Sequence, residues 1–367
     1  MKKIKDINRK PFDGETLAKL DIFEDYAEAW IPTFVMAKYE EIHIFDFFAG
    51  SGFDSSGTPG SPMRILQQIK RFIQHIFDKG TTVVFHVNEF DDDKYNELIQ
   101  SCDNYLNDNQ DVKNVISIRY NCRDFSELFD ELYPLIKKYP SLVYLDQYGV
   151  KFLSEKYIKA LENTETTDFL YFVSSSHFLR FGSTMEFQKH FNFDVEQAKK
   201  EPYKFIHRNL IKQMRDSLLK DSELKLYPFS IKKGNNIHGI IFGAKNIRAI
   251  DKFLDIAWRR APINGDANFD IDDEGTIGQI DIFGNQRMSK KEIFSKKLED
   301  FVKLNKIVTN KDVFIFTLSL GHTRQHGAEV IKNLKTQKAL TYIGKSPKID
   351  YKYVKKDLDI VEIKWTR

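Results

Sequence analysis

Residues 42–52 read Ile42-His43-Ile44-Phe45-Asp46-Phe47-Phe48-Ala49-Gly50-Ser51-Gly52. This apolar run ends in Gly-x-Gly, and Gly60-Ser61-Pro62 and a helical pattern follow it. Small residues at the end of a strand let the backbone approach a ligand closely, and the next helix presents free N–H groups to that ligand. The stretch therefore predicts a ligand-binding turn between a buried strand and a helix.

The composition is that of a globular protein. Hydrophobic residues make up 41% of the 367 residues, and the length favours one large domain with a smaller one. The net charge of +3 predicts no general affinity for nucleic acid. We expect a cytoplasmic protein, because neither a secretory signal nor a membrane helix is evident. Cys102 and Cys122 lack metal-type spacing, so we expect no metal site.

From residue 40 onward, β-rich runs alternate with helical patterns, which is typical of a parallel sheet built from βαβ units. We expect strands at 42–48, 81–87, 115–119, 142–146 and 169–174, and helices at 61–77, 92–106, 125–138 and 154–162. A charged helical stretch covers about 186–220. Two further runs, 224–232 and 238–243, are joined by Lys233-Gly234-Asn235-Asn236 and predict an antiparallel hairpin.

This order predicts an α/β chain with the Rossmann-like class I methyltransferase fold, a seven-stranded mixed sheet. The polar stretch 264–268 and the acidic run 270–274 indicate a domain boundary. Helices at 290–304, 312–320 and 325–336 and an alternating tail predict a small α+β winged-helix domain. The expected domains are an N-terminal helical segment (1–38), a Rossmann-like domain (39–265) and a winged helix-turn-helix domain (270–367).

Open α/β sheets bind ligands at the carboxyl ends of their strands, and here those ends predict a site for S-adenosylmethionine. The first strand supplies Asp46, Phe48 and the turn at Gly50 and Gly52, where the backbone approaches the amino-acid end of the cofactor and Asp46 receives its ammonium group. The second strand leads to Glu89. This carboxylate either accepts hydrogen bonds from both ribose hydroxyls or is a solvated loop residue.

The third and fourth strands complete the candidate site. Asp124 either pairs with the adenine amino group or caps the helix that follows it. The fourth strand ends at Asp146-Gln147-Tyr148-Gly149, where amino methyltransferases acting on bases carry Asp/Asn-Pro-Pro-Tyr/Phe. Asp146 and Tyr148 are therefore the candidate catalytic residues, although the missing prolines weaken the case for amine methylation. Cytosine C5 methylation needs a Pro-Cys nucleophile near this strand. It is set aside, because neither cysteine of the chain lies there.

Positive charge concentrates in the predicted C-terminal domain. Candidate nucleic-acid contacts are Lys290, Lys291, Arg324, Lys332, Lys335 and Lys345, with Ser61 assigned to substrate binding in the first domain. Phosphate contacts of this kind supply affinity that falls with salt. The alternative is that these helices are solvated faces or mediate protein contacts.

Several segments together resemble the three-Cys-motif partner protein family, bacterial proteins encoded beside radical-SAM-like proteins that carry three cysteines. They are Leu17-Ala18-Lys19 with Tyr26 to Pro32, where Leu20 stands in place of a usual histidine; Phe45 to Gly52 with Gly60-Ser61-Pro62; Leu145 to Gly149, where Gln147 replaces a usual proline; and Phe242 to Asn246 through Trp258 to Phe269. They cover the chain to about residue 270.

The resemblance implies a class I methyltransferase-like fold, a neighbouring three-Cys-motif partner and a winged helix at the C-terminus. Two functions follow from it. One is an S-adenosylmethionine-dependent nucleic-acid methyltransferase. The other is a catalytically inactive adaptor that recruits its partner to nucleic acid in DNA repair, nucleic-acid modification or phage defence.

Overall fold

The computed structural model describes residues 10–147, 154–189, 191, 193–276, 287–355 and 359–367. The chain divides into two compact units, Met1–Lys245 and Asn246–Arg367. This division falls before the polar stretch 264–274 that the sequence indicates as a boundary. Helix α12 (Ile247–Arg260) belongs to the second unit, where Trp258 Nε1 donates to the Gly321 carbonyl at 2.9 Å.

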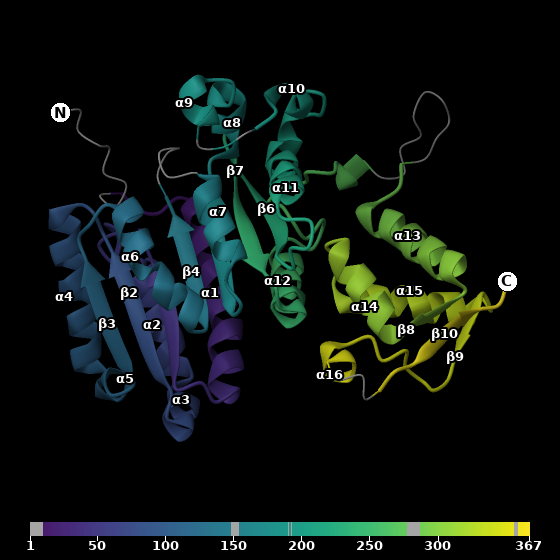
Figure 1. The fold of residues 1–367 in the computed structure, drawn as a ribbon, viewed down its shortest axis with the longest axis horizontal. Helices are drawn as coiled ribbons and strands as arrows, with labels where there is room; N and C mark the ends of the chain where they lie inside the picture. The colour runs from purple at the N-terminus through teal and green to yellow at the C-terminus, as the bar shows by residue number, and fades with distance from the viewer. Residues whose placement is uncertain (1–9, 148–153, 190, 192, 277–286, 356–358) are drawn as a thin grey trace. The chain divides into compact units, whose positions relative to one another are not determined.

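The first unit is built on a seven-stranded sheet in the order β3-β2-β1-β4-β5-β7-β6 (Figure 1). Its strands are β1 (Glu41–Asp46), β2 (Thr82–Asn88), β3 (Ile116–Asn121), β4 (Ser141–Asp146), β5 (Thr167–Val173), β6 (Lys225–Lys233) and β7 (Asn236–Ala244). Strands β1 to β5 are parallel, and β7 runs antiparallel to both β5 and β6. The sheet confirms the predicted Rossmann-like methyltransferase fold class.

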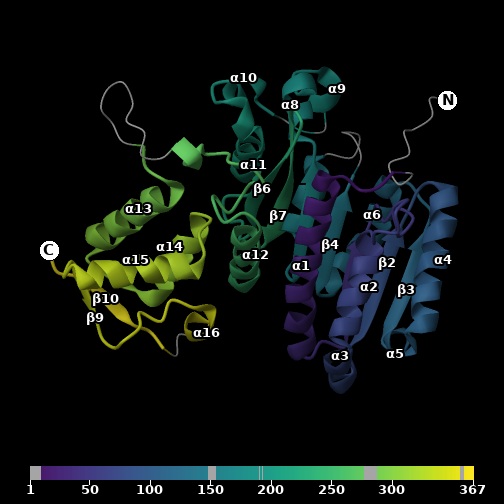
Figure 2. The same cartoon turned by 180° about the vertical axis from the view of Figure 1, so that it is seen from behind.

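Helices cover both faces of this sheet: α6 and α7 lie in front of it in Figure 1, and α1 and α2 lie in front in Figure 2. The helices are α1 (Gly14–Met36), α2 (Ser61–Arg71), α3 (Ile73–Lys79), α4 (Asp92–Asp108), α5 (Gln110–Lys113), α6 (Phe125–Lys138), α7 (Glu155–Glu162), α8 (Ser175–Phe181), α9 (Met185–Gln188), α10 (Val195–Ala198), η1 (Tyr203–Phe205) and α11 (Ile206–Ser217). The predicted helix 61–77 is two helices, because the backbone leaves the helical region at Phe72 (φ −103°, ψ 13°).

Local chemistry explains the side of the sheet formed by β5, β7 and β6. Gly234 has φ 54° in the β6–β7 turn, a conformation that glycine adopts without strain. Pro228 lies in β6, which is an edge strand where a missing N–H is tolerated. Strand β5 is buried along its whole length, as a near-continuous apolar run in a covered sheet requires.

Buried contacts attach α1 to the sheet. Its Phe23 ring stacks on Tyr144 of β4 with centroids 3.9 Å apart, and the Tyr26 hydroxyl donates to Asp168 of β5 at 2.8 Å. Asp13 caps the helix by accepting from the Thr16 N–H at 2.9 Å. The N-terminal helix is therefore an integral layer of the first unit.

The second unit combines helices with a small antiparallel sheet in the order β8-β10-β9. Its elements after α12 are η2 (Glu274–Thr276), α13 (Lys290–Asn305), β8 (Ile307–Thr309), α14 (Asn310–Ser319), α15 (Arg324–Thr336), β9 (Leu340–Tyr342), α16 (Tyr351–Val354) and β10 (Glu362–Trp365). The sequence predicts that the tail after α15 alternates like a strand throughout, which is wrong for Tyr351–Val354, because Asp350 caps the short helix α16 there.

Candidate functional site

The centre of the candidate site is Asp46, the last residue of β1. Its side chain is buried, with 1% of the residue exposed, and it accepts from the Ser61 hydroxyl at 2.6 Å and from the Phe48 N–H at 3.3 Å. Burial is the main cause that raises the pKa of Asp46, the two hydrogen bonds oppose the shift, and the nearby carboxylates of Asp146 and Glu89 add to it, which gives a net pKa of about 7. The predicted residues Asp146 and Glu89 therefore both lie within electrostatic reach of Asp46.

Ser61 differs from its predicted role. The sequence predicts a substrate-binding role for Ser61. In the structure only 5% of the residue is exposed, and its hydroxyl donates a hydrogen bond to Asp46. It stands at the first position of α2, after Gly60. Ser61 therefore joins the start of α2 to the end of β1 and holds the glycine turn between them.

Glu89 also acts on this turn. One carboxylate oxygen accepts the Gly50 N–H at 3.0 Å, and the other accepts the Asp91 N–H at 3.0 Å. Gly50 has φ 65°, so the turn is held in a left-handed conformation by a residue from the neighbouring strand. A carboxylate oxygen can accept two hydrogen bonds, which leaves a further acceptor position on each oxygen of Glu89 for a ligand.

The need for glycine at position 52 comes from packing. Gly52 has φ 94°, and a Cβ atom there would lie 2.9 Å from Cβ of Ser101 on α4. The Ser101 hydroxyl donates to the Ser51 carbonyl at 3.1 Å. A cavity of about 540 Å³ opens on this side of the turn, lined by residues of 51–63 and α4, and none of the predicted cofactor residues lines it.

Asp124 takes the second of its two predicted roles. It caps α6 by accepting from the Ser126 N–H at 2.9 Å and also bonds the Ser126 hydroxyl. Sequence reasoning missed the neighbouring Asn88, which is 3% exposed at the end of β2. Its amide donates to the carbonyls of Phe47 and Arg123 at 3.2 and 3.1 Å, so it holds three loops together at this edge.

Phe48 lies beside α6, with its ring centroid 5.0 Å from that of Phe125. It is partly exposed, as a residue lining a ligand site at this edge would be.

Asp146, at the end of β4, is paired with Lys19 of α1. The ammonium group lies 2.7 Å from one carboxylate oxygen and 2.5 Å from the other, and the two side chains are 14% and 16% exposed. The Lys19 ammonium also sits 4.5 Å from the centroid of the Phe172 ring on β5. Tyr148 lies outside the described residues.

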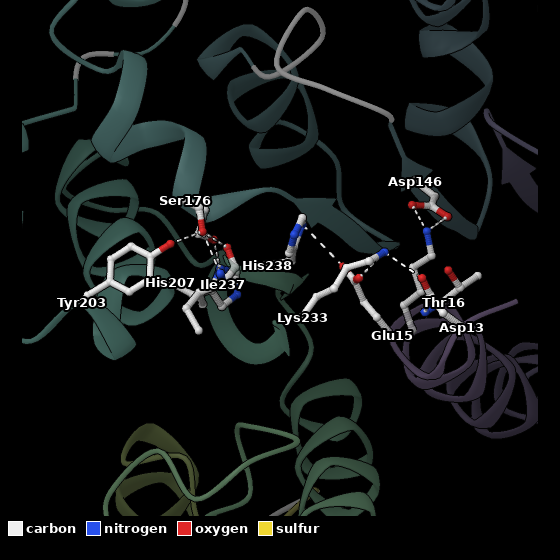
Figure 3. A network of polar contacts seen from close by, with 12 residues as sticks. Asp13, Glu15, Thr16, Asp146, Ser176, Tyr203, His207, Lys233, Ile237 and His238 are labelled. Atoms are coloured by element: carbon white, nitrogen blue, oxygen red, sulfur yellow. Dashed lines mark hydrogen bonds and ion pairs between the residues drawn. The ribbon is translucent and has the colours of Figure 1, made fainter. Parts of the chain in front are cut away.

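A strip of polar contacts continues from this pair across β7 and the β6–β7 turn (Figure 3). Glu15, one helical turn before Lys19, lies 2.7 Å from the Lys233 ammonium and 3.5 Å from Nδ1 of His238. Burial lowers the pKa of His238, which favours its neutral form. In the sequence analysis Lys19 appeared only as part of a family resemblance. Its ion-pair partner, Asp146, is 127 residues away in the chain.

The predicted cations of the second unit fall into two groups. Arg324 is held among carboxylates: its guanidinium lies 2.8 Å from Asp251 and 3.2 Å from Asp350, and it also pairs with Asp255. This compensated charge differs from the phosphate contact expected of Arg324, because three acidic partners already neutralise it.

The lysines differ in whether their ammonium groups are held by backbone carbonyls or are exposed to solvent. Lys290 donates to the Asn264 carbonyl at 2.6 Å, and Lys335 donates to the Tyr342 and Gly344 carbonyls at 3.0 and 3.1 Å. Lys291 is exposed and lies 5.2 Å from the Trp258 ring centroid. Lys332 on α15 and Lys345 after β9 are also exposed. Lys291, Lys332 and Lys345 are therefore the best candidates for contacts with an anionic ligand.

No model of a known protein family matches the sequence, and no curated protein is detectably similar to it. Among solved structures, the chain is similar to the O-methyltransferase TomG from Streptomyces achromogenes, which is involved in tomaymycin synthesis and was solved in complex with S-adenosylmethionine. That similarity covers 59% of this chain and 78% of TomG, at 9% identity and a TM-score of 0.32. The fold class rests on the strand order.

Two further findings concern metal ions and membranes. Within the described ranges, no three His, Cys, Asp or Glu side chains are arranged to hold a metal ion. In the same part of the chain, no helix is both long and apolar enough to cross a bilayer.

Proposed function

We propose that the first unit binds S-adenosylmethionine at the carboxyl edge of β1 and β2, and that the chain acts on nucleic acid held by the second unit. One observation carries this proposal. The strand order reverses between β1 and β4, and the glycine turn, Asp46 and Asp146 all lie at the carboxyl ends of these two strands. Ligands of open α/β sheets bind at such a reversal point.

The chemistry of the residues fits this cofactor. A buried carboxyl group at Asp46 suits an ammonium group, and the remaining acceptor positions of Glu89 suit a pair of ribose hydroxyls. When bound, the cofactor supplies an electrophilic methyl group on a sulfonium. The chain's own residues position it: Glu89 fixes the turn, and Asn88 fixes the loops beside it.

For the second unit we propose a winged helix that contacts nucleic acid through α15 and the segment after β9. The element order α13, β8, α14, α15, β9, α16 and β10 supports this proposal, with the short helix α16 between the last two strands. Helix α15 exposes a face of hydrogen-bonding side chains suited to phosphates and base edges. Its members are Gln325, Glu329, Lys332, Asn333 and Thr336.

Calorimetry with S-adenosylmethionine tests the cofactor assignment. Glu89→Gln keeps an amide oxygen for the Gly50 N–H but removes a charge and an acceptor, so we expect roughly 10-fold weaker binding with little change in melting temperature. Glu40→Gln, at an exposed position just before the start of β1, is the matched control and should bind as wild type does. Absence of binding by the wild-type chain, or equal weakening in both variants, would refute the assignment.

Charge reversal tests the nucleic-acid surface. Lys332→Glu combined with Lys345→Glu should weaken binding to a mixed-sequence oligonucleotide about 10-fold or more and reduce its salt dependence. Lys79→Glu combined with Lys137→Glu changes the net charge equally at exposed positions of α3 and α6. Equal losses in the two double variants would show that only net charge matters and would remove the claim.

A second function, a non-catalytic adaptor for a three-Cys-motif partner, is favoured by the end of β4. Gln147 stands where the resembling family has proline, and both carboxylate oxygens of Asp146 are paired with Lys19. An exocyclic amine would therefore compete with the lysine ammonium for this carboxylate. Co-purification of the chain with the protein encoded beside it, combined with a failure to transfer methyl label, would support the adaptor.

A further inference from the structure

The Lys19–Asp146 pair determines which hydrogen-bonding groups the end of β4 offers to a substrate. A free aspartate at the end of β4 offers only acceptors, which suits an amine. Here the lysine ammonium contacts both carboxylate oxygens, at 2.7 and 2.5 Å. An ammonium group has three N–H donors, so the pair retains a donor for a ligand beside a carboxylate that can still accept a proton.

The surroundings keep this pair together at the site. The Phe172 ring lies 4.5 Å from the lysine ammonium and gives it a favourable electrostatic contact. Both members of the pair are mostly buried but remain accessible, at 14% and 16% side-chain exposure. Screening by solvent is therefore weak, and the pair is preorganised.

An adjacent donor and proton acceptor suit a hydroxyl group, which accepts one hydrogen bond and gives up one proton. Within a nucleic-acid strand, the free hydroxyl is the 2′-hydroxyl of ribose, which DNA lacks. We propose that Lys19 and Asp146 bind and activate the ribose 2′-hydroxyl of an RNA strand. The inference rests on the proposed function for the methyl donor and for the nucleic-acid partner.

The transfer balances with these groups. Lys19 donates a hydrogen bond to the 2′-oxygen, and Asp146 takes its proton. The 2′-oxygen forms a bond to the methyl carbon as the carbon–sulfur bond of the sulfonium donor breaks, and that electron pair stays on sulfur. Asp146 then loses the proton to water, and the products are a 2′-O-methyl ribose and a neutral thioether.

Two measurements on the full chain test this inference. The first is binding of a mixed-sequence single-stranded RNA and its DNA counterpart by fluorescence anisotropy. The second is transfer from methyl-labelled S-adenosylmethionine, followed by alkaline digestion. A 2′-O-methyl group protects the adjacent phosphodiester from alkali, because the blocked oxygen cannot attack it. We expect label on RNA, in alkali-resistant dinucleotides, and tighter binding of RNA than of DNA by about 3- to 10-fold.

Variants assign these effects to the pair. Lys19→Met should abolish the RNA preference and lower kcat by about 100-fold or more, whereas Lys19→Arg should restore part of both. Lys70→Met is the matched control, because it breaks an exposed ion pair with Asp111 on another part of the first unit. Its RNA preference and transfer should equal those of wild type.

Different results would refute the role of the Lys19–Asp146 pair and the proposed cofactor. Calorimetry without S-adenosylmethionine binding rejects the proposed cofactor, while the RNA preference still decides the role of Lys19. Equal affinity for RNA and DNA, label on DNA, label in alkali-labile mononucleotides, or an unchanged RNA preference in Lys19→Met would each overturn the inference.

Discussion

The substitution Asp46→Asn tests the physical state of the candidate site directly. In the folded chain the pKa of Asp46 is raised by burial from 3.8 to about 7. The folded state therefore holds its proton more tightly than the unfolded state, and stability falls as the pH rises between about 4 and 7. Above pH 7 the full difference applies, which corresponds to roughly 4 kcal/mol.

Asparagine removes this penalty because it carries no charge at any pH. Its Oδ1 atom can still accept from the Ser61 hydroxyl, whereas its amide would face the Phe48 N–H, which costs about 1 kcal/mol. The net expectation is a variant more stable than wild type by roughly 3 kcal/mol at about pH 8. At about pH 4.5 the remaining penalty in wild type is roughly 1 kcal/mol, so the two proteins should be nearly equal.

Urea unfolding followed by far-UV circular dichroism measures this difference at the two pH values. Asp111→Asn is the control, since pairing with Lys70 lowers the pKa of Asp111 and the variant should gain no stability as the pH rises. A gain for Asp46→Asn that is the same at both pH values, or a loss at about pH 8, would refute the assignment of a buried, weakly acidic Asp46.

Three further predictions concern the cofactor, the unit boundary and a close helix approach. Binding of S-adenosylmethionine at about pH 6.5 should release a proton, because an ammonium group favours ionised Asp46; calorimetry in two buffers of different ionisation enthalpy would detect it, and Asp46→Asn should abolish it. A fragment starting at Asn246 should fold cooperatively by circular dichroism, whereas one starting at residue 270 should not, because it lacks α12. Gly327→Ala should destabilise the second unit by about 1–3 kcal/mol, measured by urea unfolding, since its Cβ would lie 2.4 Å from Oγ1 of Thr317. Gly14→Ala is the control: its Cβ would meet no atom within 4 Å, so stability should be unchanged or slightly higher.

Periodicity in the sequence was sufficient to predict the sheet. The ends of the seven strands lie within two residues of the predicted ends, because a covered sheet demands apolar runs and the β6–β7 turn demands glycine chemistry. The break between α2 and α3 carries no such signal, since Phe72 fits either an apolar helix face or a helix end.

The site was less predictable, because its contacts join distant parts of the chain. The carboxyl ends of the strands identified Asp46, Glu89 and Asp146, but nothing in the local sequence indicates that Lys19 pairs with a residue 127 positions later. The same reason explains Arg324: its acidic partners Asp251 and Asp255 come from α12, which the sequence assigned to the other domain.

The strand order also governs how this chain assembles. The β6–β7 hairpin joins residues at most 19 positions apart, from Lys225 to Ala244, whereas His43 of β1 pairs with Ser141 of β4, 98 positions later. Distant pairings form slowly because the intervening chain must first be ordered. The β1–β4 junction, which carries the candidate site, should therefore be among the last parts of the sheet to gain protection from hydrogen exchange during refolding, after the hairpin at the sheet's edge.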